Sequence, residues 1–318
     1  MKIHNITQGL RESFVNWVAG NQKNYVLLGI VTFGFPLRFM RWIFETGDGG
    51  KPWGNKSCFT LSFDCDYPED IEAIPSVLKV LKGYPFKVSF ACVGYWIEKY
   101  PEIHKEILGA GHEIVNHTYS HPDNELLNPG RKFKDIPKNE KREELEKCHE
   151  ICWKILRYEP KGCRIPHFKN LFTREIYSIL EELNYVYSSS TWSTMGKPWG
   201  SPFLASNGIV EFPLSTCPKH PFTVFDTWHA LNSPRWSHRI VHRSGPEDYE
   251  RMFRHLLRLG KYYSSYLNVY IDPLDVSKIA RFPLLLDMLV DIEVEVLTYS
   301  QFLEKYPVVA PGKTRDQK

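Results

Sequence analysis

From residue 58 onward, short apolar runs alternate with segments of helical periodicity, and this alternation restricts the possible folds more than any other property of the 318-residue chain. We expect strands at 58–63, 87–94, 112–116, 185–190, 209–212, 267–271 and 293–297. We expect helices at 70–81, 101–110, 139–157, 173–184, 247–261 and 280–290. Repeated β-α units predict a parallel sheet with helices outside it. Because about 250 residues hold many such units, the sheet is expected to close, or nearly close, into an α/β barrel.

The composition is that of a globular protein and excludes several classes. Apolar residues make up 42% and charged residues 24%, which argues against a disordered, collagen-like or polytopic membrane protein. The 40 Lys and Arg against 37 Asp and Glu leave a net charge of only +3, too little for a basic nucleic-acid surface. The 7 Cys are odd in number and form no C-x-x-C pair, so we expect reduced thiols.

Residues 1–56 differ from the rest and are predicted to form an extension that ends in a linker. The uncharged run 25–37 is too short to cross a bilayer, and a basic, aromatic run follows at 38–44. Apolar and aromatic side chains with Arg between them suit peripheral contact with a membrane through residues 25–44. They also suit a helix packed on the main domain or on a partner. The stretch 47–56 is rich in Gly and turn formers, which favours a linker.

The location of the protein is a further expectation from the same segment. A signal peptide places its apolar stretch near the start of the chain, and here that stretch lies behind a mixed polar lead. We therefore expect a cytoplasmic protein, including the inner face of the membrane. The main domain is expected at 57–306, and residues 307–318 are expected to form a loose tail.

Polar side chains follow the expected strands at the edge where sites form in parallel α/β folds. Asp64 and Asp66 come directly after the first strand, in F-D-C-D-Y-P. Two carboxylates this close repel, so a cation or an Arg must lie near them. His117 and His121 follow the third strand, in N-H-T-Y-S-H, a spacing that puts two imidazoles on one side of a helical turn. One Asp and two His suit a cation such as Zn²⁺, with water in an open position.

A third cluster is C-R-I-P-H-F, in which Arg164 follows a short strand. A fixed guanidinium orients a carboxylate and holds it ionised. Each pattern is common by itself, and a lone D-x-D is usually a solvated turn. The ordered set is specific, because D-x-D after a strand, H-x3-H after a later strand and then R-x-P occur in one chain.

This ordered set resembles the polysaccharide deacetylases, carbohydrate esterase family 4 with the NodB homology domain, over roughly residues 58–306. L-S-F-D-C-D is similar to the first motif of the family, HTYSH to the second and R-I-P-H-F to the third. LNYVYSSSTW resembles the strand that carries the fourth motif. The resemblance implies a distorted (β/α)7-type barrel with parallel strands and a hydrolase that acts on amide bonds.

The resemblance also implies a role for each matching residue. Asp64 would be the general base, held by Arg164. The backbone N–H of His167 would help to stabilise the oxyanion, and Trp192 would form an apolar wall near the acetyl methyl group. Three side chains would hold a divalent metal, expected to be Zn²⁺: Asp66, His117 and His121.

The last motif departs from the family. The family has a His after the late strand, and this chain has Asp272, followed by Pro273, after LNVYI. That His normally protonates the leaving amine. Asp272 would do so only if burial raised its pKa well above ~4. His229, in FDTWHALN, is the alternative proton donor, and an ordinary loop histidine is the competing interpretation.

The resemblance implies metal-dependent removal of an N-acyl group, acetyl, from an amino sugar in a glycan or a lipid-linked saccharide, a reaction of cell envelope biosynthesis. Two alternatives stay open. One is a metal-independent amide hydrolase similar to allantoinases, although such relatives tend to lose the metal residues. The other is a catalytically impaired glycan-binding pseudo-enzyme, for which Asp272 would mark the lost proton transfer.

Overall fold

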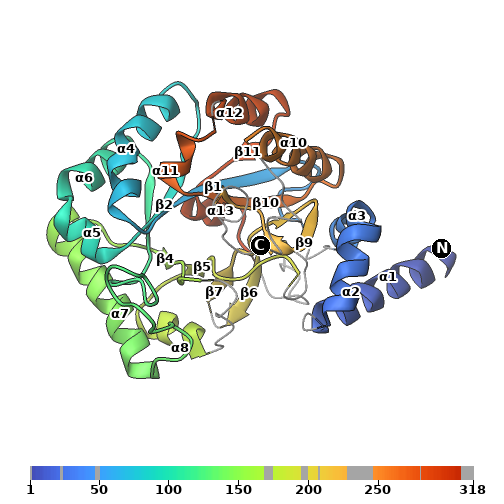
Figure 1. The fold of residues 1–318 in the computed structure, drawn as a ribbon, viewed down its shortest axis with the longest axis horizontal. Coiled ribbons are helices and arrows are strands. Elements are labelled where there is room, and N and C mark those ends of the chain that lie inside the picture. The colour runs from blue at the N-terminus through green and yellow to red at the C-terminus, as the bar shows by residue number, and fades with distance from the viewer. Residues whose placement is uncertain are drawn as a thin grey trace, which may run out of the picture.

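The computed structural model describes residues 2–21, 24–46, 51–167, 175–194, 200–206, 208–227, 246–279 and 281–308. A curled sheet lies at the centre of the main domain, with helices around its outside, and three N-terminal helices lie at one side of it (Figure 1). This arrangement confirms the predicted α/β barrel with an N-terminal extension. The loose tail predicted at 307–318 falls almost wholly outside the described residues.

The central sheet accounts for nine strands of the described residues. Every neighbouring pair runs parallel except the edge pair β6–β7, and β11 pairs with β1 beside the main path. The order across the sheet, followed by β11, is β10 (Tyr266–Ile271), β1 (Cys58–Cys65), β2 (Ser89–Cys92), β3 (Glu113–Asn116), β4 (Gly162–Cys163), β5 (Tyr187–Ser188), β7 (Ile209–Glu211), β6 (Phe203–Ser206) and β11 (Glu295–Val296).

The two ends of the sheet approach each other without forming a regular ladder. The backbone N–H of Ser215 donates to the Asn268 carbonyl at 2.8 Å, and the Asn268 side-chain amide donates to the Phe212 carbonyl at 3.0 Å. The segment after β7 thus reaches β10 through a few isolated bonds. The barrel is therefore distorted and nearly closed, as predicted. All residues of β1 are buried, as expected for a parallel strand covered on both faces.

Helices cover the outer face of the sheet, and all seven Cys are buried and free. The short helices α5, α11 and α13 were not predicted, because four to seven residues give too little periodicity to detect. The helices after β1 are α4 (Pro68–Leu81), α5 (Gly94–Lys99), α6 (Pro101–Gly109), α7 (Lys138–Ile151) with a π-helical turn η2 (Cys152–Leu156), α8 (Glu175–Glu182), α10 (Pro246–Tyr262), α11 (Pro273–Val276), α12 (Phe282–Asp291) and α13 (Tyr299–Lys305).

The N-terminal extension consists of helices that pack on one another and on the barrel through α3. The ring of Phe39 lies 5.4 Å from that of Phe222 on β9, and Phe44 stacks on Tyr263 at 6.0 Å. Residues 51–56 also contact the barrel, since the Trp53 indole donates to the Ser264 carbonyl at 2.7 Å. The elements involved are α1 (Lys2–Gly20), α2 (Tyr25–Gly29), the π-helical turn η1 (Ile30–Gly34), α3 (Pro36–Thr46), β8 (Thr216–Cys217) and β9 (His220–Val224).

In the described part of the chain, no single helix has the length and apolar character needed to cross a membrane. The segments Val26–Gly34 and Pro36–Thr46 meet that test only when taken together, and they are bent by 94° at the break between them. Pro36 opens the second segment, which fits the bend, because proline lacks the N–H that would continue the helical bonding.

Candidate active site

Asp64 and Asp66 reach the same side of the sheet because side chains alternate along a strand. Asp64 is the penultimate residue of β1, and Asp66 follows the end of the strand. Cys65, between them, points the other way and belongs to the apolar core. Both carboxylates therefore lie at the carboxyl end of β1. This confirms the prediction that they occupy the edge of the sheet where parallel strands end.

His117 and His121 approach each other through an irregular turn, which corrects the predicted helical turn. Thr118 and His121 have left-handed backbones, with φ of 64° and 48°. The Asn116 side chain accepts from the Thr118 N–H at 2.9 Å, and Glu144 of α7 accepts from the Ser120 N–H at 2.8 Å. These side-chain acceptors replace the helical hydrogen bonds that the spacing led us to expect. The two imidazole centroids lie 4.9 Å apart.

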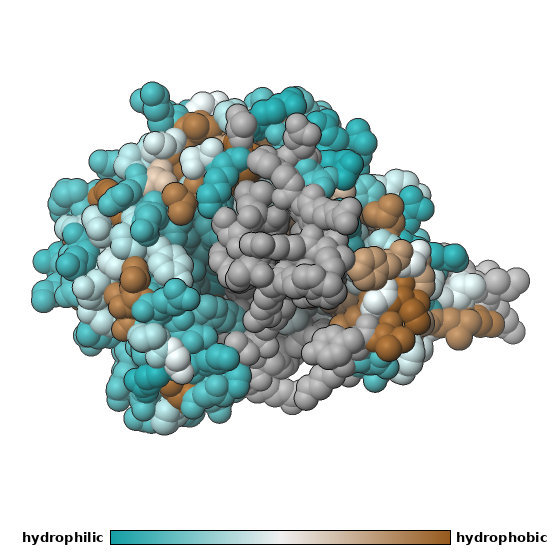
Figure 2. Space-filling model, viewed as in Figure 1, coloured by the Kyte–Doolittle hydropathy of each residue, from teal (hydrophilic) through white to brown (hydrophobic). Residues whose placement is uncertain are grey.

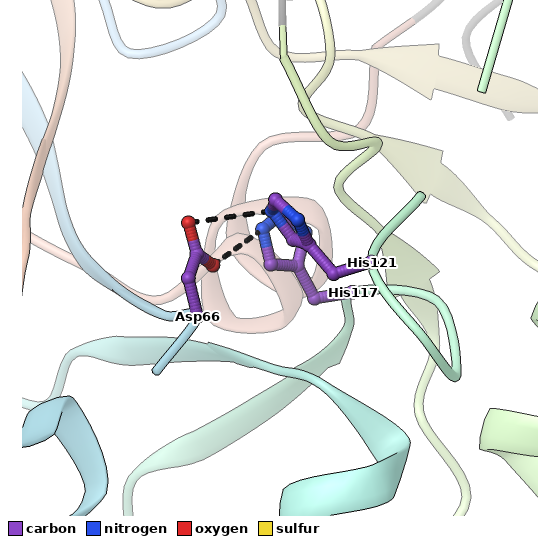
Figure 3. Close-up of side chains that lie close together, drawn as sticks. All are labelled: Asp66, His117 and His121. Atoms are coloured by element: carbon purple, nitrogen blue, oxygen red, sulfur yellow. Dashed lines mark ion pairs between the residues drawn. The ribbon is translucent and has the colours of Figure 1, made fainter. Parts of the chain in front are cut away.

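The two His side chains and Asp66 form one compact donor set (Figure 3). His117 Nε2 lies 3.1 Å from one Asp66 oxygen, and His121 Nε2 lies 3.3 Å from the other. The ligand atoms of the three residues all lie within 4.8 Å of one another. Burial disfavours ionisation of Asp66, but the two imidazoles hold the pKa of this carboxyl well below its usual range. The geometry therefore brings together the three predicted metal ligands.

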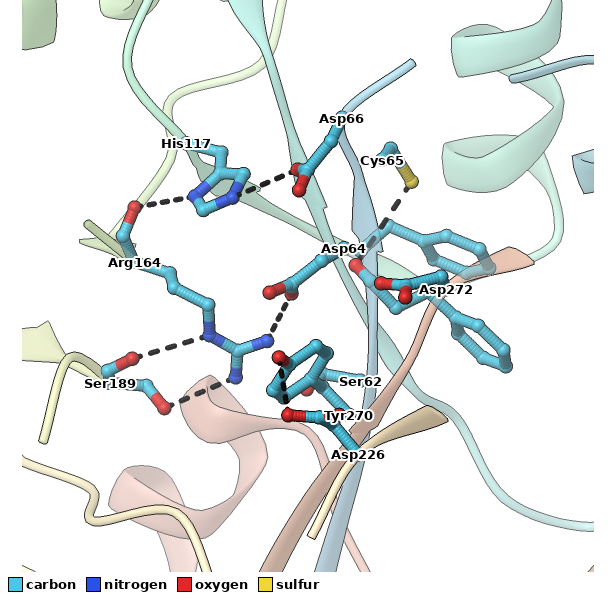
Figure 4. A network of polar contacts seen from close by, with 12 residues as sticks. Ser62, Asp64, Cys65, Asp66, His117, Arg164, Ser189, Asp226, Tyr270 and Asp272 are labelled. Carbon is cyan, nitrogen blue, oxygen red and sulfur yellow. Dashed lines mark hydrogen bonds and ion pairs between the residues drawn. The ribbon is translucent and has the colours of Figure 1, made fainter. Parts of the chain in front are cut away.

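The Arg164 side chain lies between Asp64 and Ser189 and contacts both (Figure 4). Its guanidinium is completely buried, pairs with Asp64 and donates to the Ser189 carbonyl at 3.2 Å and the Ser189 hydroxyl at 3.1 Å. The Tyr299 hydroxyl also accepts from it, and the Tyr270 ring lies 5.4 Å away. Burial raises the pKa of Asp64, and the charge of Arg164 opposes that rise. The predicted pairing of Asp64 with Arg164 is thus present.

Asp272 lies at the same edge, after β10. Its backbone N–H donates to the Thr227 hydroxyl at 3.0 Å. Burial, followed by the negative charges of Asp70 and Asp275, raises the pKa of Asp272 well above its usual range. A raised pKa of this carboxyl is what the sequence required of Asp272 as a proton donor. The alternative donor, His229, lies outside the described residues.

The remaining two predicted residues have different surroundings. The His167 ring lies 5.0 Å from that of His121, and its backbone is left-handed, with φ of 57°. The main chain after Pro166 is thereby at the edge that carries the predicted metal ligands. Trp192 is buried in an apolar cluster that also contains Tyr270, the residue whose ring faces Arg164.

Several residues that support the site carried no recognisable signal in the sequence. The Asp66 carbonyl accepts from the Trp96 indole at 2.8 Å and from the Asn124 side chain at 2.9 Å. Asp70 accepts from the Asp66 N–H at 3.3 Å and from the Leu274 N–H at 3.1 Å, which ties α4 to α11. These residues fix the position of Asp66 from three other segments. They are common residue types in loops and helix ends, so only their placement reveals the role.

Comparison with known proteins supports the resemblance. Residues 52–188 match the family described as polysaccharide deacetylase. A peptidoglycan-N-acetylglucosamine deacetylase of Bacillus cereus is 38% identical over 113 residues, which is 36% of this chain and 37% of that protein. A chitooligosaccharide deacetylase of a Bradyrhizobium species is 31% identical over 87 residues, 27% of this chain and 38% of that protein. The matched segments thus span less than half of either relative.

The fold agrees with a solved structure at low sequence identity. The crystal structure of a protein from Mycobacterium smegmatis superposes with a TM-score of 0.64 at 19% identity and covers 83% of this chain and 96% of that one. The likeness confirms the distorted barrel beyond the segment that the sequence match covers. The segment 52–188, which carries the Asp66–His117–His121 donor set and the Asp64–Arg164 pair, is thus the part of this chain that is similar to the polysaccharide deacetylase family.

Proposed function

We propose that this protein hydrolyses the amide bond of an N-acetylated amino sugar in a glycan or a lipid-linked saccharide, with the help of a divalent metal, expected to be Zn²⁺. One observation carries the proposal. A three-residue donor set and a buried carboxylate–guanidinium pair meet at one edge of the barrel. A hydrolase needs both parts, because the metal site alone would serve binding and the Asp64–Arg164 pair alone would serve structure.

The residues fit a divalent metal. His117 Nδ1 lies 2.7 Å from the Arg164 carbonyl oxygen, so it carries the proton and leaves the Nε2 lone pair for a metal. Asp66 Oδ1 is buried and lacks a hydrogen-bond partner, so this oxygen is available as a ligand atom. Two imidazoles and one carboxylate are a usual zinc donor set with an open position. A divalent metal held by these three residues would polarise the amide carbonyl and lower the pKa of the attacking water.

The surrounding side chains would move the protons. Asp64 takes a proton from the attacking water, and burial makes it a stronger base than an exposed carboxylate. Arg164 keeps Asp64 ionised and oriented. The backbone N–H of His167 donates to the carbonyl oxygen as negative charge develops there, a contribution typically worth ~10²–10³ in rate.

The leaving nitrogen needs a proton before the amine departs. Asp272 is the described candidate, because burial, followed by the negative charges of Asp70 and Asp275, raises the pKa of this carboxyl well above its usual range. His229 stays the alternative donor. Release of acetate leaves an amine that is cationic at neutral pH, so the reaction changes the charge of the glycan.

The substrate class rests on the relatives, two of which are named for N-acetylated amino-sugar polymers or oligomers. We place the reaction in the cytoplasm, including the inner face of the membrane, as part of the same proposal. Seven buried, free thiols support a reducing compartment.

The first test measures metal content by elemental analysis for the wild-type protein and for His117→Ala, both after addition of zinc and dialysis. We expect about one equivalent of metal in the wild type, little in the variant, and acetate release from N-acetylglucosamine oligomers only by the wild type. His149→Ala is the matched control, since His149 lies on α7 and bonds the Tyr185 hydroxyl at 3.1 Å.

Two results would redirect the assignment. Acetate release by a wild type that holds no metal would favour the allantoinase-like alternative. Metal and oligosaccharide binding without any turnover on N-acetylated glycans would favour the glycan-binding pseudo-enzyme.

A further inference from the structure

For its length, the N-terminal extension exposes far more large apolar side chains than the barrel does. Seven of them lie on α1 to α3, and their exposed fractions run from 47% to 74%. The described barrel residues contribute six, spread over separate loops and helices. In Figure 2 the hydrophobic surface gathers at the side where α1 to α3 lie. The seven exposed residues are Ile6, Leu10, Trp17, Val26, Ile30, Phe33 and Leu37.

These side chains form two continuous faces rather than scattered contacts. Ile6, Leu10 and Trp17 are spaced by four and seven residues on α1, which places them on one side of that helix. Val26, Ile30 and Phe33 are spaced by four and three residues along α2 and η1, and Leu37 lies just beyond the 94° bend, at the start of α3. We call the two sets the exposed apolar faces. A patch of this kind marks a surface that meets another apolar phase.

The exposed faces are not the result of poor packing inside the extension. The opposite sides of the same helices are buried, at Val15 and Val18 on α1 and at Leu27 and Val31 on the bent pair. Between the helices, Phe14 contacts Trp42 edge-to-face at 5.1 Å. The extension therefore has its own apolar core, and a second set of apolar side chains remains on the outside.

The charge of the extension points to the occupant of these faces. Residues 1–46 contain five Lys and Arg and two Asp and Glu, an excess of three positive charges that equals the net charge of +3 of the whole chain. The remainder is therefore neutral. Arg11 pairs with Glu45 at 2.5 Å, and Arg38 and Arg41 lie exposed on α3. A second copy of this chain would bring like charge to the same surface, whereas an anionic lipid surface would neutralise it.

The shape of the extension favours a position in the plane of the interface. The bent pair turns by 94° at Phe35 and Pro36, so its two halves do not form one membrane-crossing rod. Exposed Trp17 suits the boundary between headgroups and acyl chains, where an amphipathic ring has one apolar and one wet side. We propose that α1, α2, η1 and α3 form an in-plane anchor that inserts the exposed apolar faces into the interface of an anionic lipid bilayer.

The anchor is fixed to the barrel next to the candidate site. Met40 of α3 accepts from the Thr216 hydroxyl at 3.2 Å on β8. The β8–β9 hairpin leads directly to Asp226 and Thr227, which bond the Tyr270 hydroxyl and the Asp272 N–H. A bilayer on the exposed faces would thus bring a lipid-linked amino sugar to the site. This consequence rests on the proposed function, whereas membrane binding itself does not.

The test is co-sedimentation of the full chain with vesicles of phosphatidylcholine containing one third phosphatidylglycerol. We expect the wild type to pellet and the double variant Ile30→Ser/Phe33→Ser to show a tenfold or greater loss of vesicle affinity. The matched control is Leu126→Ser/Tyr262→Ser, which removes two equally exposed apolar side chains from the barrel and is expected to pellet as the wild type does. Far-ultraviolet circular dichroism checks that all three proteins are folded.

Further measurements test the role of charge and distinguish a lipid surface from a second copy of the chain. Arg38→Gln/Arg41→Gln is expected to weaken binding to the anionic vesicles several-fold, as is a rise in salt from 50 to 500 mM. Equal pelleting by the wild type and by Ile30→Ser/Phe33→Ser would overturn the proposal. So would a concentration-dependent dimer in solution that the same double variant abolishes, because the occupant would then be a second copy of the chain. The assay uses no substrate, so its failure is distinct from failure of the proposed hydrolysis.

Discussion

The barrel and the N-terminal extension differ in what they hide from water. The barrel buries charge: Arg164 and Asp64 lie in its interior, as does Glu113, which accepts from the Ser89 and Tyr187 hydroxyls at 2.7 and 2.9 Å. The extension leaves apolar side chains outside, with Phe33 67% exposed. In a folded protein, buried charged side chains and exposed large apolar side chains are both more informative than the ordinary burial of hydrophobic residues.

This difference indicates what kind of contact each region makes with other molecules. A buried charge is tolerated when a partner compensates it, and Arg164 compensates Asp64 at the edge of the sheet that also carries the Asp66–His117–His121 donor set. An exposed apolar face is tolerated when another phase covers it. The barrel is therefore organised around a polar reaction, and the extension around contact with an apolar surface.

The largest effect is expected for the buried carboxylate. Asp64→Asn keeps the shape of the side chain but removes the base, so kcat for acetate release should fall by about 10²–10⁴ with metal content unchanged. Asp135→Asn, at an exposed position, should leave kcat unchanged. Loss of metal from Asp64→Asn, or retained activity, would contradict the role of Asp64 as base.

The next effect concerns stability. Arg164→Met leaves Asp64 buried without its cation and is expected to lower the free energy of unfolding by about 3–5 kcal/mol in urea titration at pH 7. The double variant Asp64→Asn/Arg164→Met should recover part of that loss, because both charges are then absent. Lys105→Met, at an exposed ion pair, should change the urea midpoint little. A double variant no more stable than Arg164→Met would contradict the charge argument.

A smaller effect comes from His112, a buried imidazole in the barrel. Burial, and then the charge of Lys87, lower the pKa of His112 to about 4, and its Nδ1 accepts from the Val88 N–H at 3.2 Å. The unfolded chain takes up this proton near pH 6.5, so stability is complete above that value and falls as the pH drops toward 4. We expect a loss of about 1–3 kcal/mol over this range.

The pH dependence can be assigned by a variant. His112→Asn keeps an acceptor for the Val88 N–H but does not titrate, so its free energy of unfolding should depend less on pH between 6.5 and 4 than that of the wild type. Parallel curves for the two proteins in urea titrations at pH 7, 5.5 and 4 would show that His112 is not responsible.

The smallest effect is expected in the extension. Phe33→Ser replaces an exposed ring and should change the free energy of unfolding by less than about 0.5 kcal/mol, with acetate release from a soluble oligosaccharide unchanged. Thermal unfolding and a turnover assay measure the two quantities. A loss above about 1 kcal/mol would show that Phe33 contributes to packing, and the contrast between the two regions would weaken.

Much of the fold and the site follows from the sequence. The alternation of strand and helix predicts a parallel sheet, and the carboxyl ends of parallel strands lie at one edge, so Asp66, His117 and His121 could be placed together from their positions alone. The residue types then indicate a metal. The short helices and the antiparallel edge strand β6 were missed, because a few residues carry too little periodicity.

Two features of the site depend on contacts between segments far apart in the sequence, so only the tertiary structure reveals them. The Asp64–Arg164 pair spans 100 residues of sequence, and its buried geometry needs Ser189 and Tyr299 from two further segments. The left-handed turn that brings His121 to Asp66 depends on Asn116 and on Glu144 of α7.

The sequence by itself determined the alternation of strands and helices along the chain and the chemical types at the strand ends, since local periodicity and residue identity fix both. It left open the protonation of Asp272, and it left open which faces of the N-terminal helices stay exposed. Both depend on what packs nearby: burial, followed by the charges of Asp70 and Asp275, raises the pKa of Asp272, and burial of Val15 and Val31 turns the opposite helix faces outward. Such properties follow from three-dimensional packing, which local sequence patterns do not encode.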